Sequence, residues 1–373
     1  MTFILAEKPV EKELNEKGFF SKSLKTETIA FIALTFGLTF LLNFVMWINY
    51  ELIAERIELF SLALQLQMLL PAFSAIVLTL FVFKSKLFSR KPRILFYYFL
   101  ILTALYALTF ALWLINPVDI ASIQLGSIEN LGLTVLMGLL SLLTTLLTFG
   151  WIGLVFFWNL KSDSRKELEA AKLSFGKPSY YLLFSLFFFG YFLLSTILNW
   201  GFNLGSPPAE QAGLGTLLLG FAAIFYGSIA GLAQLFGEEY GWRIFLQNRL
   251  SQQYGRIKSV LLVGLVWGLW HTPLVVGAGW TFPGYPVLGV ILFTILSILL
   301  SIPLGLAVFK SKSVWLAAFV HGVINYSANY LALNFYMPTD AVYSFGIGIY
   351  GLLVLGVIAL VFLKSKEWKK RED

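Results

Sequence analysis

The sequence predicts an all-α protein, a polytopic membrane bundle of about ten transmembrane helices with both termini in the cytoplasm. Of its 373 residues, 58% are hydrophobic and only 13% are charged, and the mean hydropathy is +0.80. A soluble globular domain has a far more polar balance. Two further observations support this fold class: apolar segments of membrane-spanning length follow one another along the chain, and basic residues fall in alternate connections.

A helix needs about 20 mainly apolar residues to cross the hydrocarbon of a bilayer. Segments of this kind, with their short connections, use nearly the whole chain. The first of them follows 26 mostly polar residues and precedes further spans, so we expect no cleaved signal peptide. The predicted spans are 27–47, 61–83, 94–116, 131–159, 180–200, 214–242, 259–276, 287–309, 313–331 and 343–363.

The distribution of Lys and Arg predicts the orientation of these spans, because basic residues concentrate on the cytoplasmic side of a membrane. The N-terminal arm, the even-numbered connections and the C-terminal tail carry 26 of the 27 basic residues, and Arg56 is the exception. This distribution places both termini in the cytoplasm. The net charge of +7 follows from the topology and from anionic headgroups, so it does not indicate a nucleic-acid partner.

A polar connection divides the chain into two transmembrane regions. Within it, residues 164–173 have Glu and Lys at helical spacing, and we expect a helix along the cytoplasmic surface. The first four spans have no ionisable residue in their interiors, so we expect them to be scaffold or to gate substrate. The predicted parts are a cytoplasmic arm (1–26), an accessory four-helix region (27–160), the connector (161–179), a transmembrane core (180–364, with its motifs at about 215–332) and a basic tail (365–373).

Four ionisable side chains lie inside apolar spans or directly beside them. Glu238 and Glu239 end a long apolar run, and the two histidines of the chain, His271 and His321, both lie within apolar segments. Ionisable residues in a span are costly and usually mark a pathway or a site. A helix rise of about 1.5 Å per residue places both imidazoles near mid-depth. We therefore expect Glu238 and the two histidines to converge.

Residue spacing predicts which of these side chains cooperate. Glu239 and Arg243 are four residues apart, so they share a helical face and form a pair in which each neutralises the other. Glu238 points about 100° away from Glu239, which leaves it as the freer carboxylate. His321 and Asn325 are also four apart and project together from one face.

These groups predict the hydrolysis of acyl bonds. Glu238 in an apolar setting could accept a proton from water, and His271 could orient that water or bind a metal. His321 and Asn325 could donate hydrogen bonds to an oxyanion. Pro273 follows His271 by two residues, so we expect a kink in the helix where that imidazole is displayed.

The catalytic residues of other classes of intramembrane protease are absent from this chain. There is no cysteine, no H-E-x-x-H segment and no pair of aspartates within the spans. The nearest serine candidate, 227-GSIAG-231, is better explained by small residues that allow close helix packing. Glutamate therefore stays the candidate base.

The segments 238-EEYGWR-243, 267-WGLWH-271 and 321-HGVIN-325 resemble the E-E-x-x-x-R, F-x-x-x-H and H-x-x-x-N motifs of the CAAX prenyl endopeptidase and bacteriocin-processing (CPBP, or ABI) family. Members of that family are multi-pass intramembrane proteases, here expected in a bacterial or archaeal cell membrane. Trp267 stands where the family usually has Phe. The resemblance implies Glu238 as the water-activating base, with Glu239 and Arg243 beside it, His271 as its partner, and His321 and Asn325 as oxyanion stabilisers.

The resemblance leaves the cofactor and the substrate open. The family has been described both as metalloproteases and as metal-free enzymes with a glutamate base. If a single divalent metal binds, Glu238, His271 and His321 are the available ligands and Zn²⁺ is the expected ion. We expect a peptide or protein substrate, CAAX-like or lipid-anchored, that approaches from the cytoplasm or from the inner leaflet, together with membrane lipids and no nucleic acid.

Two other functions fit the same residues. A catalytically idle immunity or scaffold protein would keep the fold, and a proton-coupled transporter would use Glu238, His271 and His321 as a relay. Transporters often contain inverted repeats and paired broken helices, and neither is recognisable in the sequence. Aromatic residues near span ends are expected to be interfacial anchors that need no ligand, namely Trp47, Trp200, Trp280 and Trp315.

Overall fold

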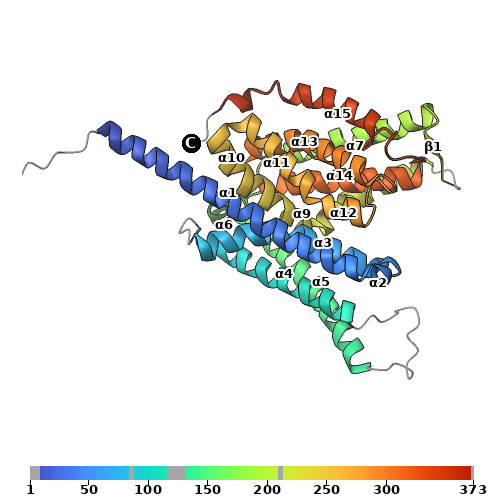
Figure 1. Ribbon diagram of the computed structural model, residues 1–373, viewed down its shortest axis with the longest axis horizontal. Coiled ribbons are helices and arrows are strands. Elements are labelled where there is room, and N and C mark those ends of the chain that lie inside the picture. The colour runs from blue at the N-terminus through green and yellow to red at the C-terminus, as the bar shows by residue number, and fades with distance from the viewer. Residues whose placement is uncertain (1–8, 84–87, 116–130, 209–212, 371–373) are drawn as a thin grey trace, which may run out of the picture.

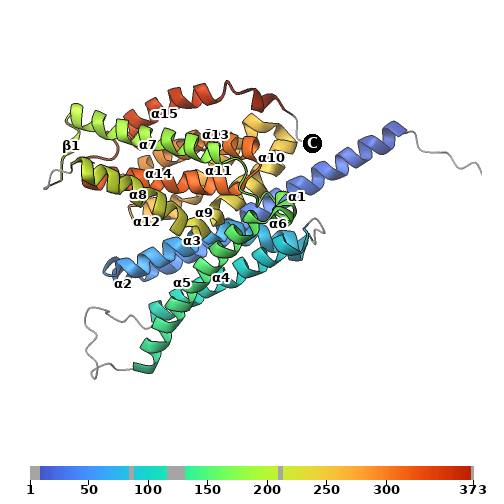
Figure 2. The same ribbon diagram turned by 180° about the vertical axis from the view of Figure 1, so that it is seen from behind.

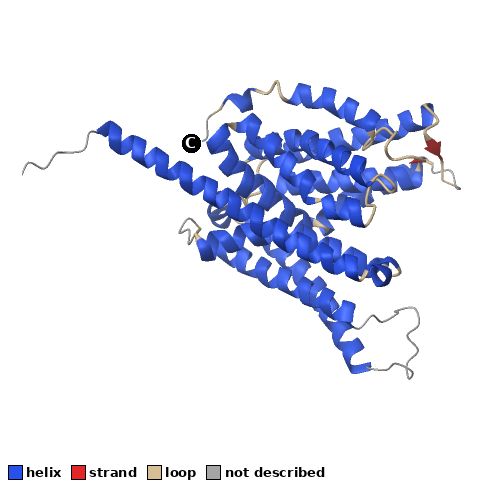
Figure 3. Ribbon diagram, in the orientation of Figure 1, coloured by secondary structure: helices blue, strands red, loops and turns tan. Residues whose placement is uncertain are grey.

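The computed structural model describes residues 9–83, 88–115, 131–208 and 213–370. Within these ranges the protein is a bundle of helices, with one short antiparallel pair of two-residue strands, β1 (Gly205–Ser206) and β2 (Met337–Pro338) (Figure 3). The all-α membrane fold predicted from the sequence is confirmed. The predicted arm before Pro9 and the predicted tail after Lys370 lie outside the described residues.

The predicted spans all correspond to helices. Their order along the chain is α1 (Pro9–Ile48), α2 (Tyr50–Ala54), α3 (Ile57–Val77) with η1 (Leu78–Val82), α4 (Arg90–Ile115), α5 (Leu131–Leu160), α6 (Ser162–Glu169), α7 (Pro178–Gly201), α8 (Leu214–Ala230), α9 (Leu232–Glu239), η3 (Tyr240–Leu246), α10 (Gln247–Tyr254), α11 (Arg256–Trp270), α12 (Thr272–Gly277), α13 (Pro286–Ser311), α14 (Val314–Asn334), α15 (Ile349–Phe362) and η4 (Lys366–Lys369). The surface helix expected at 164–173 is α6, which ends four residues earlier than predicted.

In the described chain, seven helices are long and apolar enough to cross a membrane, or eight if α8 and the helix after it form one bent span. The remaining two predicted spans fall short for different reasons. α14 contains His, Asn and Tyr side chains along its length, which lower its hydropathy, and α15 has only 14 residues because the chain before Ile349 forms turns. The protein is thus a multi-pass membrane protein, and ten spans stay a prediction.

The basic connections gather at one end of the bundle. Helices α6 and α10 and η4 lie toward the left of Figure 1, and the beginning of α1 projects beyond them on the same side. In contrast, α2, β1 and α12 lie toward the opposite end, and the reverse view agrees (Figures 1 and 2). This arrangement is the one that alternating basic connections require. That the basic end faces the cytoplasm stays a prediction.

The first helices pack directly against the segment that carries the motifs. Gly237 of α9 lies so close to α3 that a Cβ atom on it would be 2.3 Å from the Met68 carbonyl oxygen. On the neighbouring helix α1, Thr39 accepts a hydrogen bond from the indole of Trp270 at 2.7 Å, and Asn43 donates to Gln67 of α3 at 2.8 Å. The front half of the chain is therefore part of the wall around the motifs.

The helix that carries Glu238 is bent and locally widened. α8 meets the following helix at 63°, and the break falls at Gly231. Beyond Glu239 the backbone forms the π-helix η3, a form of helix that is rare and is often found at functional sites. The sequence predicted one continuous helix over 214–242, so the bend is a correction to that prediction.

The four tryptophans predicted as interfacial anchors divide into two groups. Trp47 is 65% exposed and Trp200 is 68% exposed, as the anchors of a bundle surface should be. Trp315 is 1% exposed, and Trp280 packs on the ring of His271. The prediction was wrong for Trp315, because its indole is buried among aromatic partners inside the bundle. Trp280 is half-buried in the connection before α13, and its role as an anchor stays a prediction.

The contact between Gly237 and α3 gives a test of the packing. We expect Gly237→Ala to lower the free energy of unfolding by about 1–3 kcal/mol, because the new methyl group collides with backbone that cannot yield easily. Gly190→Ala is the matched control: this helical glycine is exposed and has open space around it, so its stability should stay the same or rise slightly. Thermal unfolding in detergent measures both, and equal midpoints would contradict the close approach.

Candidate active site

The predicted site residues meet at one cavity of about 430 Å³. It is lined by Glu238 of α9, His271 at the end of α11, His321 and Asn325 of α14, and Trp267. Residues up to 87 positions apart in the sequence (Glu238 to Asn325) thus converge, as the sequence predicted. The volume is many times the ~30 Å³ of one water molecule, so the cavity is large enough to hold part of a substrate as well as water.

Glu239 lies behind this cavity and holds two other site residues. Its Oε2 accepts a hydrogen bond from Arg243 Nε at 2.9 Å, and its Oε1 lies 3.0 Å from His321 Nδ1. Arg243 also donates to the Ser301 hydroxyl of α13 at 2.7 Å. All of these side chains are buried. The predicted pairing of Glu239 with Arg243 is present, and the same carboxylate also joins α9 to α14.

Glu238 is not part of that network. Its Oε2 accepts a hydrogen bond from the indole Nε1 of Trp267 at 2.7 Å, and the carboxylate is buried. The indole ring in turn lies under the guanidinium of Arg243, whose Cζ is 4.8 Å from the ring centroid, and edge-on to His321. Trp267 is therefore the side chain that places the free carboxylate next to the Glu239 network.

His271 is displayed where its helix breaks. α11 ends at Trp270 and α12 begins at Thr272, as expected from the nearby Pro273. The His271 Nδ1 lies 2.9 Å from the carbonyl of Trp267. A carbonyl can only accept, so Nδ1 carries the hydrogen and the Nε2 of the neutral ring keeps its lone pair. The indole of Trp280 stacks on the ring, with 5.5 Å between centroids and 7° between planes.

Among the described residues no three His, Cys, Asp or Glu side chains are grouped as metal ligands. The hydrogen bonds described above occupy Glu238 Oε2 and the Nδ1 atoms of His271 and His321, and not the Nε2 atoms of the two rings. A single zinc ion held by Glu238, His271 and His321 therefore stays a prediction, and no step below depends on a metal.

Some residues of the cavity wall were not found in the sequence. Gln67 and Met68 of α3, Ser297 of α13, and Trp280 with Thr281 from the connection before α13 also line the cavity. Gln67 could have been noticed, since it is an amide within a predicted span. Its Oε1 is taken by Asn43, while its buried Nε2 has no partner. The other residues of this wall have no feature in the sequence that marks them as site residues, because only the packing of α3 and α13 brings them to the cavity.

Fold and site together define a multi-pass membrane protein with glutamate and histidine side chains at a cavity inside the helix bundle. Residues 220–327 match the family model described as type II CAAX prenyl endopeptidase Rce1-like. This segment contains all three motifs. The match confirms, for this segment, the resemblance to the CAAX prenyl endopeptidase and bacteriocin-processing family that the motifs indicated.

One relative is similar over a segment of comparable length. This chain is 32% identical over 104 residues to a protein of Methanococcus maripaludis named CAAX prenyl protease 2, and the aligned segment is 26% of this chain. The match covers 37% of that relative's length. No solved structure matches the chain significantly.

The two carboxylates should differ in what their removal does to stability. We expect Glu239→Gln to lower the free energy of unfolding by about 3–5 kcal/mol, because it leaves the buried guanidinium of Arg243 without its counter-charge. Glu238→Gln keeps an acceptor for the indole of Trp267, so it should change stability by less than about 1 kcal/mol. Thermal unfolding of the two variants in the same detergent makes the comparison, and equal losses would contradict the division of roles.

Proposed function

We propose that this protein is an intramembrane endopeptidase that hydrolyses peptide bonds of membrane-associated peptides. The observation that carries this proposal is the meeting of Glu238, His271, His321 and Asn325 at one cavity. The match of residues 220–327 to a CAAX prenyl endopeptidase domain supports the same reaction. The substrate class, including whether the peptide is CAAX-like or lipid-anchored, belongs to the proposal.

In the proposed reaction Glu238 is the base. Its carboxylate takes a proton from a water molecule while the water oxygen bonds to the carbonyl carbon of the scissile peptide bond. His271 accepts a hydrogen bond from the same water through the Nε2 lone pair and so orients it. Protonated Glu238 then delivers its proton to the amide nitrogen as the C–N bond breaks. The products are a carboxylic acid and an amine, and the carboxylate is regenerated.

His321 and Asn325 stabilise the oxyanion of the tetrahedral intermediate in this proposal. Glu239 accepts from His321 Nδ1, so Nε2 is the nitrogen that would donate to the oxyanion, in the imidazolium form. With Glu238 and Glu239 ionised, Arg243 and His321 then balance their charges, and the buried set is neutral overall. A neutral set is what a site of low polarity tolerates.

Removal of the proposed base or its partner should stop cleavage. We expect Glu238→Gln and His271→Ala each to lower the rate of peptide cleavage in membranes by about 100-fold or more, with unchanged protein level. Glu58→Gln, at an exposed position of α3, is the matched control and should cleave at the normal rate. A catalytically idle scaffold would keep its phenotype in all three variants, and a transporter would lose flux without any cleavage in the parent protein. Either result excludes the proposed peptidase.

Trp267 gives a finer test of how Glu238 is placed. Trp267→Phe keeps an aromatic ring and the backbone carbonyl that accepts from His271, but it removes the N–H donor to Glu238. A hydrogen bond to a charged group contributes about 1.5–3 kcal/mol, so we expect kcat to fall by about 10-fold to 100-fold while KM stays the same. Replacement of Trp267 by benzothienylalanine, which has the indole shape without the N–H, should have the same effect. Full activity of both variants would contradict the positioning role.

A further inference from the structure

Gln67 is a buried amide in the wall of the cavity at Glu238. It lies in the middle of α3 and is 1% exposed. The other α3 residues of this wall, Leu64 and Met68, have no hydrogen-bond donor in their side chains. The close packing of Gly237 against the Met68 carbonyl brings α3 to α9 at this level. Gln67 has no part in the reaction as proposed above, although its amide lies in the same cavity wall.

A chain of hydrogen bonds fixes the orientation of this amide. The backbone carbonyl of Thr39 can only accept, so the Asn43 atom that meets it at 2.8 Å is the amide nitrogen. The same nitrogen lies 2.8 Å from the Gln67 side chain, so the Gln67 atom at that contact is its oxygen, Oε1. The remaining group of the amide, the Nε2 of Gln67, is therefore a donor that Asn43 does not use.

This Nε2 donor is buried and has no hydrogen-bond partner within the described chain. Folded proteins leave few buried polar groups unpaired, because such a group loses its hydrogen bonds to water and gains none in return. A buried donor in the wall of a functional cavity is therefore expected to find its partner in what the cavity holds. Water can be that partner in the empty site, and a substrate acceptor can replace it.

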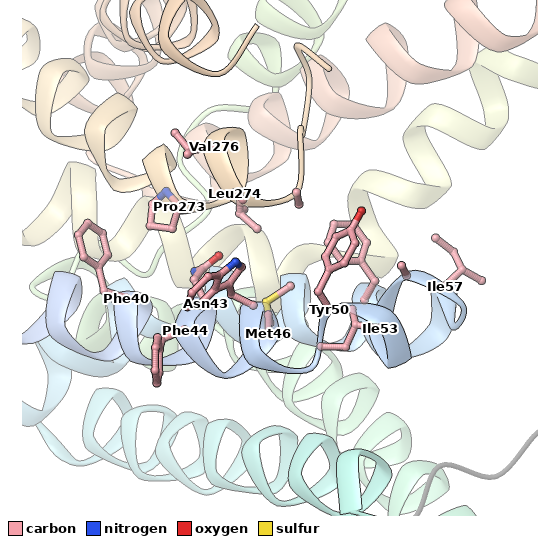
Figure 4. A pocket seen from close by; sticks show the side chains of 15 residues that line it. Phe40, Asn43, Phe44, Met46, Tyr50, Ile53, Ile57, Pro273, Leu274 and Val276 are labelled. Atoms are coloured by element: carbon pink, nitrogen blue, oxygen red, sulfur yellow. The ribbon is translucent and has the colours of Figure 1, made fainter. Parts of the chain in front are cut away.

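The same chain of hydrogen bonds ties the Gln67 amide to the segment that displays His271. The hydroxyl of Thr39 accepts from the indole of Trp270, the residue before His271, at 2.7 Å. Figure 4 shows Asn43 on α1, beside an apolar cavity of about 500 Å³ that α1 and α2 form with α12 (Figure 4). Asn43 lines that apolar cavity, whereas Gln67 lines the cavity at Glu238. Asn43 thus holds the amide of Gln67 from the side of α1.

We infer that Gln67 binds the main chain of the substrate, by donating a hydrogen bond from Nε2 to a peptide carbonyl next to the scissile bond. The inference rests on the proposed function. The scissile carbonyl itself is assigned to His321 and Asn325, so a neighbouring carbonyl of the same peptide is the acceptor left for Gln67. Every peptide has such a carbonyl, so this contact holds the substrate whatever its side chains are. It makes α3 part of the substrate site.

Removal of the donor should weaken substrate binding without slowing the chemical step. A contact away from the scissile bond is the same in the bound substrate and in the transition state, so its loss raises KM and leaves kcat unchanged. Gln67→Met keeps the length of the side chain without the amide, and we expect it to raise KM by about 5-fold, the effect of one neutral hydrogen bond. Gln65→Met is the matched control: Gln65 also lies on α3, outside the lining of this cavity, and its KM should not change.

A change in the substrate separates this contact from a structural role of Gln67. The probe is a farnesylated peptide with a CAAX-like end, in which each peptide bond beside the scissile one is replaced in turn by an (E)-alkene that keeps the shape and lacks the carbonyl. In the parent protein one replacement should raise KM by about 5-fold. In Gln67→Met the same replacement should change KM by less than about 2-fold, because the donor is already gone. If Gln67 only supported the packing of α3, every replacement would have the same effect in both proteins, and the inference would be wrong.

The same comparison can be made by binding, which does not depend on catalysis. In a Glu238→Gln background, which removes the proposed base, the Kd of the probe in detergent should show the same dependence on Gln67 and on one carbonyl. If this dependence is present but the parent protein cleaves nothing, Gln67 is the inferred donor and the proposed function is wrong. If the parent protein cleaves the probe and the dependence is absent, the proposed function stands and the inference is wrong. A probe that is neither bound nor cleaved contradicts both.

Discussion

The site depends on one buried carboxylate that holds the side chains of an arginine and a histidine from different helices. Glu239 accepts from Arg243 of η3 and from His321 of α14, with both contacts at hydrogen-bond length and all three side chains buried. A single buried charge in this setting would be very costly, and a paired one is tolerated only with good geometry. The three side chains can therefore be buried only together, which fixes α14 against the motif helix.

This network explains how Glu238 stays free although it is adjacent to Glu239. The two carboxylates leave the helix in directions about 100° apart, so Arg243 and His321 pair with one of them. The other turns to the cavity and receives the indole N–H of Trp267. The π-helix that begins at Tyr240 lies directly after this pair. Because a π-helix adds a residue to the turn, it shifts the residues beyond it relative to a regular helix, and Arg243 belongs to this shifted segment.

The sequence predicted much of the fold because the physical signals are local. Each span is a run of apolar residues, and each motif is a spacing on one helix. The break at His271 also follows from Pro273 alone. The bend at Gly231 and the widened turn after Glu239 could not be predicted, since neither changes the apolar pattern. The interior position of Trp315 was missed for a related reason: an indole near a span end has the same sequence context whether it faces lipid or the core.

Buried aromatic contacts around the site also bear on its function. A proton-coupled transporter must expose its relay to each side of the membrane in turn, and Glu238 with the two histidines would have to open toward the basic end. That movement would separate Trp242 from Trp270 and Phe236 from Trp315, rings that are buried and in contact. A hydrolase needs water and substrate from one side only. The cavity at Glu238 is large enough for water and part of a substrate without any such movement.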